Sequence, residues 1–270
     1  MLRRVAYLTA VAGIGLSLAG CAFNFLGVLE RRAAWHDQEE RACMAGRLVQ
    51  VSAHVTPVNR INDRGACGIS RPLEVAAFQR GQVGVGPAAT LNCPMTAAVE
   101  AWMTEAVQPA AIAWLGATVT GIKQISAYAC RPINNIPGEQ LSEHAFGNAI
   151  DVAGFDLADG RAITVKRDWN GERNARAFLR EVFTAACGRF KTVLGPGVAY
   201  HGDHFHLDLA HHNAGGTSRY CRPNPDGAAP RRAPYDGAPI VALTPIWPDS
   251  RLPRVTDQTI AGLISAYAGE

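Results

Sequence analysis

Apolar residues recur at helical spacing over two long segments of the chain, 96–115 and 174–190. In the first segment Thr96 is placed to cap a helix, and apolar residues such as Trp102 follow at helical spacing. Pro109 predicts a kink there, or a split into two helices. In the second segment the apolar positions share one helix face, which we expect to contact the core. This face consists of Phe178, Leu179, Val182, Phe183 and Ala186.

Four shorter segments alternate apolar and polar residues or are rich in β-branched types, which is typical of strands. They cover 118–128, 150–155, 162–167 and roughly 204–210. The segment 22–51 predicts one or two helices, whereas the turn-forming residues of 55–72 predict irregular structure. Together these elements predict an α+β fold, in which a small central antiparallel sheet is flanked by helices.

The N-terminus has the pattern of an export signal. Two arginines precede an apolar run over 5–18, and small residues lead from it to Cys21. The run is shorter than the roughly 20 residues of a comfortable membrane span. Leu-Ala-Gly-Cys also resembles the bacterial lipobox, which implies a lipid on Cys21; a plain signal peptide or an uncleaved anchor is the alternative. Because Ala22 rather than Asp follows, the resemblance implies a periplasmic protein anchored to the outer membrane.

The overall composition is that of a folded protein, with 48% hydrophobic and 18% charged residues in a chain of 270. This length can bury one sizeable core or two small ones. The net charge is only +3, and no basic run is interleaved with aromatic residues, so nucleic-acid binding has no support.

Cysteines other than Cys21 are even in number, and we expect them to form up to three disulfides in an exported protein. Their pairing stays open at this level. No two of them form a Cys-x-x-Cys pair, which argues against a cysteine-rich structural zinc site. The six candidates are Cys43, Cys67, Cys93, Cys130, Cys187 and Cys221.

Histidines and carboxylates concentrate in two short segments, the first of which is 142–151. Gly147 permits a sharp turn before a strand in which Asp151 faces away from its apolar neighbours. His144 approaches from the preceding loop and can meet the same ion as Asp151. A core histidine and a turn-capping aspartate are the alternative interpretation.

In the second segment, His204 and His206 share one strand face, and Asp208 follows on the same face. Phe205 and Leu207 point to the opposite side, towards a core. A polar face of this kind is costly to bury without a polar or metal partner. Asp208 is placed to orient a ligand imidazole through its free N–H, although a solvated strand end is the alternative.

Both segments resemble known zinc motifs. Residues 142–151 match Ser-x-His-x-x-Gly-x-Ala-x-Asp at every fixed position, and 201–206 end in His-x-His. These patterns resemble the two motifs of the lysostaphin/D-Ala-D-Ala-peptidase/hedgehog superfamily, which includes M15-like peptidases. The wider sequence, with 126–131 and 192–197, resembles the bacterial extensin-like C-terminal domain family over more than half the chain.

The superfamily resemblance implies Zn2+ on His144, Asp151 and His206, with His204 as the catalytic histidine beside the metal. Some relatives place a general-base Glu where this chain has Asp203, which is shorter and in a strand faces away from the last ligand. Other relatives use a His-x-x-His-x-His pattern, which His201 completes here. We therefore expect His204 to act as base, acid or transition-state stabiliser, with His201 and Asp203 as supporting candidates.

Two further residues are assigned to the substrate by the same resemblance. Arg131 falls where related peptidases bind a substrate carboxylate, although a surface salt bridge is the alternative. Ser142 is also often placed at the substrate. The remaining histidines are expected to be exposed or hydrogen-bonded rather than ligands; they are His36, His54, His211 and His212.

Four parts of the chain follow from these patterns. We expect a lipoprotein signal peptide over 1–20, a membrane-proximal helical spacer over 21–55, an extensin-like, M15-like zinc domain over 56–222, and a Pro-rich tail over 223–270.

The expected function is zinc-dependent hydrolysis of an amide bond in peptidoglycan stem peptides, by a DD- or LD-endopeptidase or carboxypeptidase. The first alternative is a zinc-containing module that binds cell wall or a partner without cutting, because hedgehog-type relatives keep the motif as signalling ligands. The second is a disulfide-stapled scaffold without metal. The apparent presence of a full catalytic set favours the enzyme.

Overall fold

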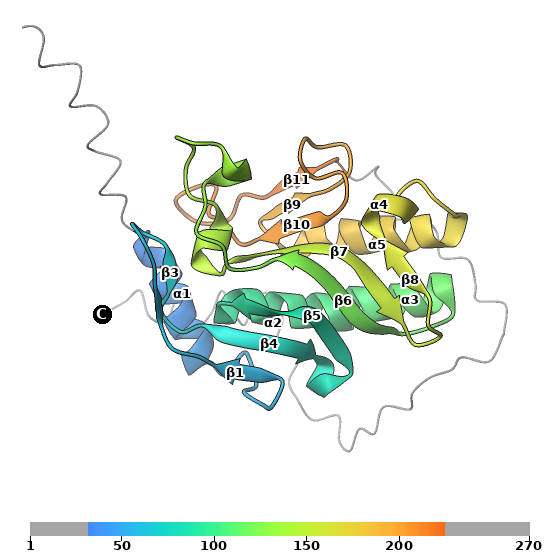
Figure 1. Cartoon of the computed structure of the whole chain (residues 1–270), viewed down its shortest axis with the longest axis horizontal. Coiled ribbons are helices and arrows are strands. Elements are labelled where there is room, and N and C mark those ends of the chain that lie inside the picture. Colours follow the sequence, from blue (N-terminus) through green and yellow to red (C-terminus); the bar gives the residue numbers. More distant parts are fainter. Residues whose placement is uncertain (1–31, 225–270) are drawn as a thin grey trace, which may run out of the picture.

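The structure is a computed structural model that describes residues 32–224 (Figure 1). The expected signal peptide, Cys21 and nearly all of the Pro-rich tail therefore lie outside the described residues. No helix within 32–224 is long and apolar enough to cross a membrane.

A single mixed sheet organises the molecule and contains nine strands within the described part of the chain. Its order is β1-β4-β5-β6-β7-β10-β9-β11, and β8 pairs with β7. The β5/β6 and β9/β11 pairs are parallel, and the others are antiparallel. The strands are β1 (Val55–Pro57), β4 (Leu73–Phe78), β5 (Val83–Leu91), β6 (Val119–Ser126), β7 (Ala149–Leu157), β8 (Ala162–Thr164), β9 (Thr192–Leu194), β10 (Phe205–Asp208) and β11 (Tyr220–Arg222).

The prediction of an α+β fold is confirmed, but the sheet is larger than expected and is not purely antiparallel. The segment 55–72, expected to be irregular, contributes β1 and a separate two-stranded ribbon of β2 (Ile61–Asn62) and β3 (Gly68–Ile69). The predicted strands at 118–128, 150–155 and 204–210 are present as β6, β7 and β10. Of the strand predicted at 162–167, only the first half is present, as β8, because Thr164 caps a short helix that follows.

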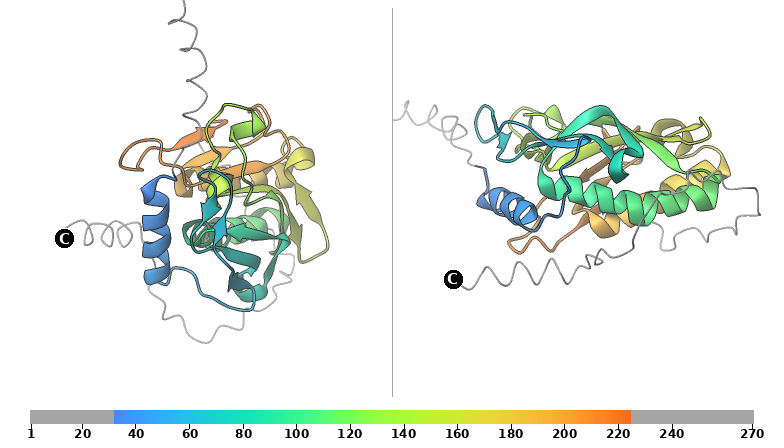
Figure 2. Two further views of the ribbon diagram at one scale, coloured as in Figure 1. Left: turned by 60° about the vertical axis from the view of Figure 1, so that its left-hand side comes forward. Right: turned by 90° about the horizontal axis from the view of Figure 1, so that it is seen from below.

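Helices cover one face of this sheet, as the two views of Figure 2 show. Trp102 joins two of them, since its indole N–H donates to the carbonyl of Val182 at 3.0 Å. The helices are α1 (Ala34–Ala45), α2 (Cys93–Trp102), the π-helical turn η3 (Met103–Val107), α3 (Gln108–Leu115), α4 (Val165–Asp168) and α5 (Arg173–Arg189). The 3-10 turns are η2 (Gln79–Gly81), η4 (Ile133–Asn135) and η5 (Glu143–Phe146).

The helix predicted over 96–115 begins earlier than expected. Its cap is Asn92 rather than Thr96, and the side chain of Asn92 accepts a hydrogen bond from the backbone N–H of Met95. The disturbance predicted at Pro109 is a π-helical turn, η3, that joins α2 to α3. Proline lacks the N–H of a regular helical bond and its ring collides with the carbonyl four residues back, so the backbone widens in the preceding turn.

The core lies between the sheet and the helices, and the predicted apolar face of α5 is fully buried in it. The prediction of disulfides is confirmed by three pairs within the described residues: Cys43–Cys93, Cys67–Cys130 and Cys187–Cys221. The first of these connects α1 to the start of α2. The helix expected within the spacer 21–55 is therefore α1, and it is packed against the domain through His36, Glu40 and Cys43.

Candidate metal centre

Three side chains that lie up to 62 residues apart in the sequence converge in one buried group. His144 comes from η5, Asp151 from β7 and His206 from β10, and candidate ligand atoms of all three lie within 4.8 Å of one another. Asp151 and His206 are direct cross-strand partners in the β7/β10 ladder. Their side chains therefore share one face, while Ile150 and Val152 point into the core on the other.

Hydrogen bonds on the outer side of each imidazole decide which nitrogen faces the centre. Nδ1 of His144 lies 2.6 Å from the carbonyl oxygen of Ala127, to which it donates. Nε2 of His206 lies 2.9 Å from a carboxylate oxygen of Asp208, to which it donates. The inner nitrogens, Nε2 of His144 and Nδ1 of His206, are 3.2 Å apart. Each is left with its lone pair directed inwards, as a metal ligand requires.

The third donor is the carboxylate of Asp151, which lies between these nitrogens. Its oxygens are 3.2 Å from Nε2 of His144 and 2.9 Å from Nδ1 of His206. Two imidazole nitrogens and one carboxylate oxygen are a donor set suited to a divalent zinc-type cation. The sequence-based ligand set is thus a geometrically plausible metal-binding trio.

Electrostatics at the centre favour a positive charge. Burial disfavours protonated His206, but the carboxylates of Asp151 and Asp208 outweigh it and raise its pKa to about 10. Burial likewise disfavours ionised Asp151, yet its contacts with the imidazoles of His144 and His206 hold the pKa of that carboxyl well below its usual range. The same negative charges of the carboxylates therefore stabilise either a proton on His206 or a bound cation.

His204 lies beside the trio, where the superfamily resemblance puts a catalytic histidine. Its Nε2 is 3.7 Å from Asp151, and its Nδ1 is 2.8 Å from a carboxylate oxygen of Asp203. Asp203 thus contacts His204 rather than the trio itself. His201 stands close by, with its ring centroid 5.2 Å from that of His204 and 5.8 Å from that of His206.

His201 is fixed by its own backbone contact, since its Nδ1 lies 2.7 Å from the carbonyl oxygen of Ala199. Burial lowers the pKa of its imidazole, against the opposing effect of that contact. The residue before it, Tyr200, is in the left-handed backbone region with a φ of 68° and keeps its ring largely exposed. A neutral imidazole is therefore held near the trio by a strained loop.

The two predicted substrate residues also lie at the centre. The guanidinium of Arg131 is 3.8 Å from a carboxylate oxygen of Asp151, so its ion pair is with a candidate ligand rather than with a remote surface group. Ser142 is buried at the N-cap of η5, where its hydroxyl accepts from the backbone N–H of His144. In this position Ser142 orients the ligand-bearing turn.

Four residues that lie behind the centre were not predicted from the sequence to support it. Glu143, Asn148 and Asn92 form a buried polar network, and His36 joins it from α1. Glu143 and Asn148 occupy variable positions of the zinc motif, which carries no signal for their contacts. Asn92 lies four residues before the predicted helix start, where Thr96 was the expected cap, and its role as the cap of α2 was not predicted.

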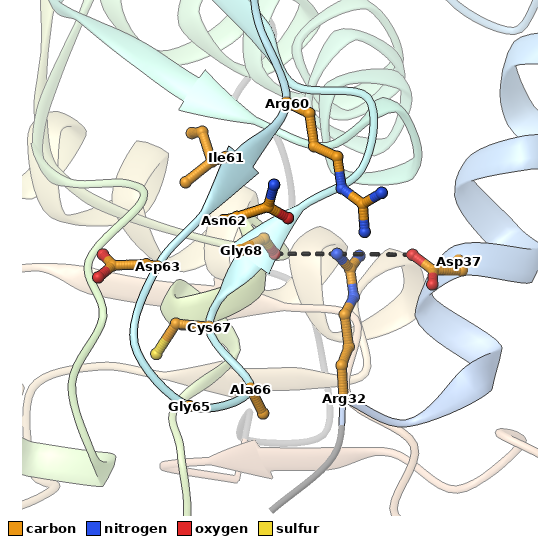
Figure 3. A pocket seen from close by; sticks show the side chains of 10 residues that line it. All are labelled: Arg32, Asp37, Arg60, Ile61, Asn62, Asp63, Gly65, Ala66, Cys67 and Gly68. Carbon is orange, nitrogen blue, oxygen red and sulfur yellow. Dashed lines mark hydrogen bonds and ion pairs between the residues drawn. The ribbon is translucent and has the colours of Figure 1, made fainter.

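The other histidines behave as expected. His36 is hydrogen-bonded to Glu143, His211 to Glu39 and His212 to Thr192, and His54 is exposed. A hollow of about 350 Å³ lies between the start of α1 and the β2–β3 ribbon (Figure 3). Its lining has none of the trio and carries charges of both signs.

Residues 32–224 thus form a disulfide-bonded α+β domain with a candidate metal centre. The domain has a mixed sheet with helices on one face, three disulfides and a buried His-Asp-His trio. The family model described as extensin-like protein C-terminus matches residues 41–222. The chain therefore belongs to the extensin-like C-terminus family. No curated protein and no solved structure matches it.

Proposed function

We propose that this protein is a zinc-dependent peptidase that hydrolyses amide bonds of peptidoglycan, as a DD- or LD-endopeptidase or carboxypeptidase. The observation that carries the proposal is the inward direction of three lone-pair donors, with the Nε2 of His204 beside them. The resemblance of 142–151 and 201–206 to M15-like zinc motifs supports the reaction class.

The donor set fits zinc. His144, Asp151 and His206 supply three ligands of the types zinc prefers, and a catalytic zinc site keeps a further position open. Asp208 supports the fit because it holds the proton of His206 on the outer nitrogen. Zinc held by these residues would supply a Lewis acid that polarises a carbonyl and acidifies a water.

His204 is the candidate for proton transfer. The carboxylate of Asp203 accepts the Nδ1 proton of His204, which leaves the Nε2 lone pair directed towards Asp151 and the centre. In this tautomer Nε2 takes a proton from the attacking water and returns it to the leaving amine. Asp203 also stabilises the imidazolium formed in between.

Arg131 is the candidate for substrate binding. Its guanidinium already lies beside a carboxylate, that of Asp151, and is partly exposed. A planar guanidinium binds a carboxylate through two parallel hydrogen bonds. Arg131 would therefore hold a carboxylate of the stem peptide and set the position of the scissile amide.

The place of action follows from the N-terminus, which lies outside the described residues. The export pattern and the lipobox-like Leu-Ala-Gly-Cys21 support a periplasmic protein held to the outer membrane by lipid. Peptidoglycan stem peptides are an abundant peptide substrate in that compartment.

The test is mass spectrometry of muropeptides after incubation with the protein, with and without a chelator. The native protein should release cleaved stem peptides only when zinc is present. His206→Ala should lose both zinc and cleavage. His204→Ala should keep zinc and lose cleavage by about 100-fold or more.

His54→Ala is the matched control, because His54 is an exposed histidine remote from the trio in sequence and should change neither quantity. Cleavage by His204→Ala at the native rate would refute the catalytic assignment. Zinc binding without any cleavage by the native protein would point to the non-catalytic module instead.

A further inference from the structure

Helix α1 reaches the metal motif through the side chain of His36. Nε2 of His36, in α1, donates to Oε2 of Glu143 at 3.0 Å. Glu143 directly precedes the candidate ligand His144 in η5. His36 is only 3% exposed and packs its ring on Phe146, which lies in the same turn as the ligand. The contact therefore joins α1 to the ligand-bearing turn over 107 residues of sequence.

The same carboxylate oxygen of Glu143 holds the other end of the turn. It accepts from the side-chain amide of Asn148 at 2.7 Å, and the backbone N–H of Asn148 donates to the carbonyl of Glu143 at 3.0 Å. The side-chain oxygen of Asn148 in turn accepts from Asn92, the cap of α2, at 2.9 Å. Glu143 and Asn148 thus close the turn that carries His144.

Asn148 also contacts the two strands that carry the other candidate ligands. It directly precedes β7, which carries Asp151. Its carbonyl accepts from the backbone N–H of Leu209 at 3.3 Å, just beyond the end of β10, which carries His206. One small network therefore touches all three segments that supply the trio.

We propose that α1 is a structural part of the metal centre, and that His36 and Glu143 are positioning residues for His144. Asn148 and His36 are almost completely buried, so each loses a specific partner when Glu143 changes. Supporting groups of this kind typically change metal affinity between about 10- and 100-fold. The inference rests on the zinc binding of the proposed function but not on cleavage, so it stands whether or not the centre cleaves peptides.

Helix α1 is also attached by contacts that do not involve His36, which makes the test specific. Its Asp37 accepts from the hydroxyl of Ser70 at 2.6 Å, and its Glu40 accepts from the backbone N–H of Arg71 at 2.9 Å. Cys43 bonds it to α2. Figure 3 shows Asp37 and Arg32 at this second attachment, facing the β2–β3 ribbon.

The experiment measures Zn2+ affinity by competition with a chromophoric chelator, the visible spectrum of the Co2+-loaded protein, and the free energy of unfolding. His36→Phe keeps a ring but removes the donor, and Glu143→Gln keeps the size but removes the charge. Each should weaken Zn2+ binding by about 10- to 100-fold and alter the Co2+ spectrum. His36→Gln, which retains a donor, should recover most of the native affinity.

Glu40→Gln is the matched control, since Glu40 is a fully buried carboxylate on the same helix but contacts Arg32 and Arg71 rather than the motif. It should destabilise the protein and leave Zn2+ affinity within about threefold of native, well under the effect of a supporting group. Native Zn2+ affinity in His36→Phe would overturn the proposal. Equal losses in Glu40→Gln and His36→Phe would overturn it too, because the effect would then be general destabilisation.

Discussion

At the scale of single residues, the carboxylate of Asp208 sets the chemistry of the centre although it contacts only the outer nitrogen of His206. By accepting the Nε2 proton of His206, it leaves Nδ1 as the inward nitrogen. In the absence of a cation, Nδ1 holds a proton against Asp151, which explains why the pKa of His206 is raised to about 10 although the imidazole is buried. Metal and proton therefore compete for the same nitrogen.

This competition predicts how the stability of metal-free protein depends on pH. The folded-state pKa of His206, about 10, lies above its ordinary value of 6.5. The resulting stabilisation is fully present below pH 6.5 and is lost as the pH rises towards 10. We expect the free energy of unfolding to fall by up to about 1 kcal/mol per pH unit in this window. Urea unfolding of chelator-treated protein at a series of pH values measures it.

Zinc-loaded protein is the control for this prediction. Its His206 has already given up the inward proton, so its stability should not fall in the same way, and Zn2+ affinity should rise with pH over the same window. Metal-free stability that stays constant from pH 6.5 to pH 10 would contradict the assignment of the proton to His206.

The three members of the candidate metal-binding trio were predictable from sequence because the motif spacing carries them. Their roles were less so. That Nδ1 rather than Nε2 of His206 faces inwards depends on Asp208 being two residues away in a strand, which a pattern only suggests. The contact of Arg131 with Asp151 and that of His36 with Glu143 cross 20 and 107 residues, respectively, and only the folded chain creates them.

At the scale of elements, the turn between η5 and β7 holds His144 and Asp151 at a fixed separation. Gly147 ends η5 with a φ of 61°, a region that favours glycine. An added Cβ would meet Cδ1 of Ile69 at 2.3 Å and the backbone nitrogen of Asn92 at 3.1 Å. Gly147 therefore has a backbone conformation that other residues rarely adopt, and its surroundings leave no room for a side chain.

Gly147→Ala should accordingly destabilise the protein by about 2–5 kcal/mol, as the sum of left-handed strain and collision. It should also weaken Zn2+ binding, because the segment between two ligands must shift. Gly138→Ala is the control: Gly138 has a φ of 90° but nothing within 4 Å of its Cβ position. That variant should lose only about 1–2 kcal/mol of unfolding free energy and should keep the native Zn2+ affinity. Denaturant unfolding and chelator competition measure both; equal losses would show that packing at Gly147 is unimportant.

Elements with a long, regular pattern were predictable, and the others show why sequence alone is insufficient. Helix α5 repeats its apolar face over four turns, so its bounds differ by one residue from the prediction. Strand β5 contains Gly84, Gly86 and Pro87, which indicate turns in isolation but here lie in a sheet. Strands β9 and β11 have three residues each, too few for any period. Strand β4 alternates buried and exposed positions only over Leu73–Ala77, and the sequence 75–78 is apolar throughout, so the pattern there is too weak to predict a strand.

At the scale of the whole molecule, the disulfides connect distant parts of the sheet and its helices. Cys43–Cys93 attaches α1 to α2 across 50 residues, and Cys187–Cys221 attaches α5 to the edge strand β11 across 34. Removing a native disulfide from a small exported domain typically costs about 2–5 kcal/mol, chiefly by releasing the unfolded chain. On stability alone, the two bonds should therefore be nearly equivalent.

Their effects on the metal centre should differ. Replacing Cys43 and Cys93 together by Ala loosens the helix that carries His36, so Zn2+ binding should weaken as well as stability. Replacing Cys187 and Cys221 together should lower stability by a similar amount and preserve Zn2+ affinity, because β9 lies between β11 and the strand of His206. Thermal unfolding and chelator competition on both double variants separate the two effects. Equal Zn2+ affinities in the two double variants would mean that α1 stabilises the fold without supporting the centre, since Cys43 attaches to the domain the helix that carries His36.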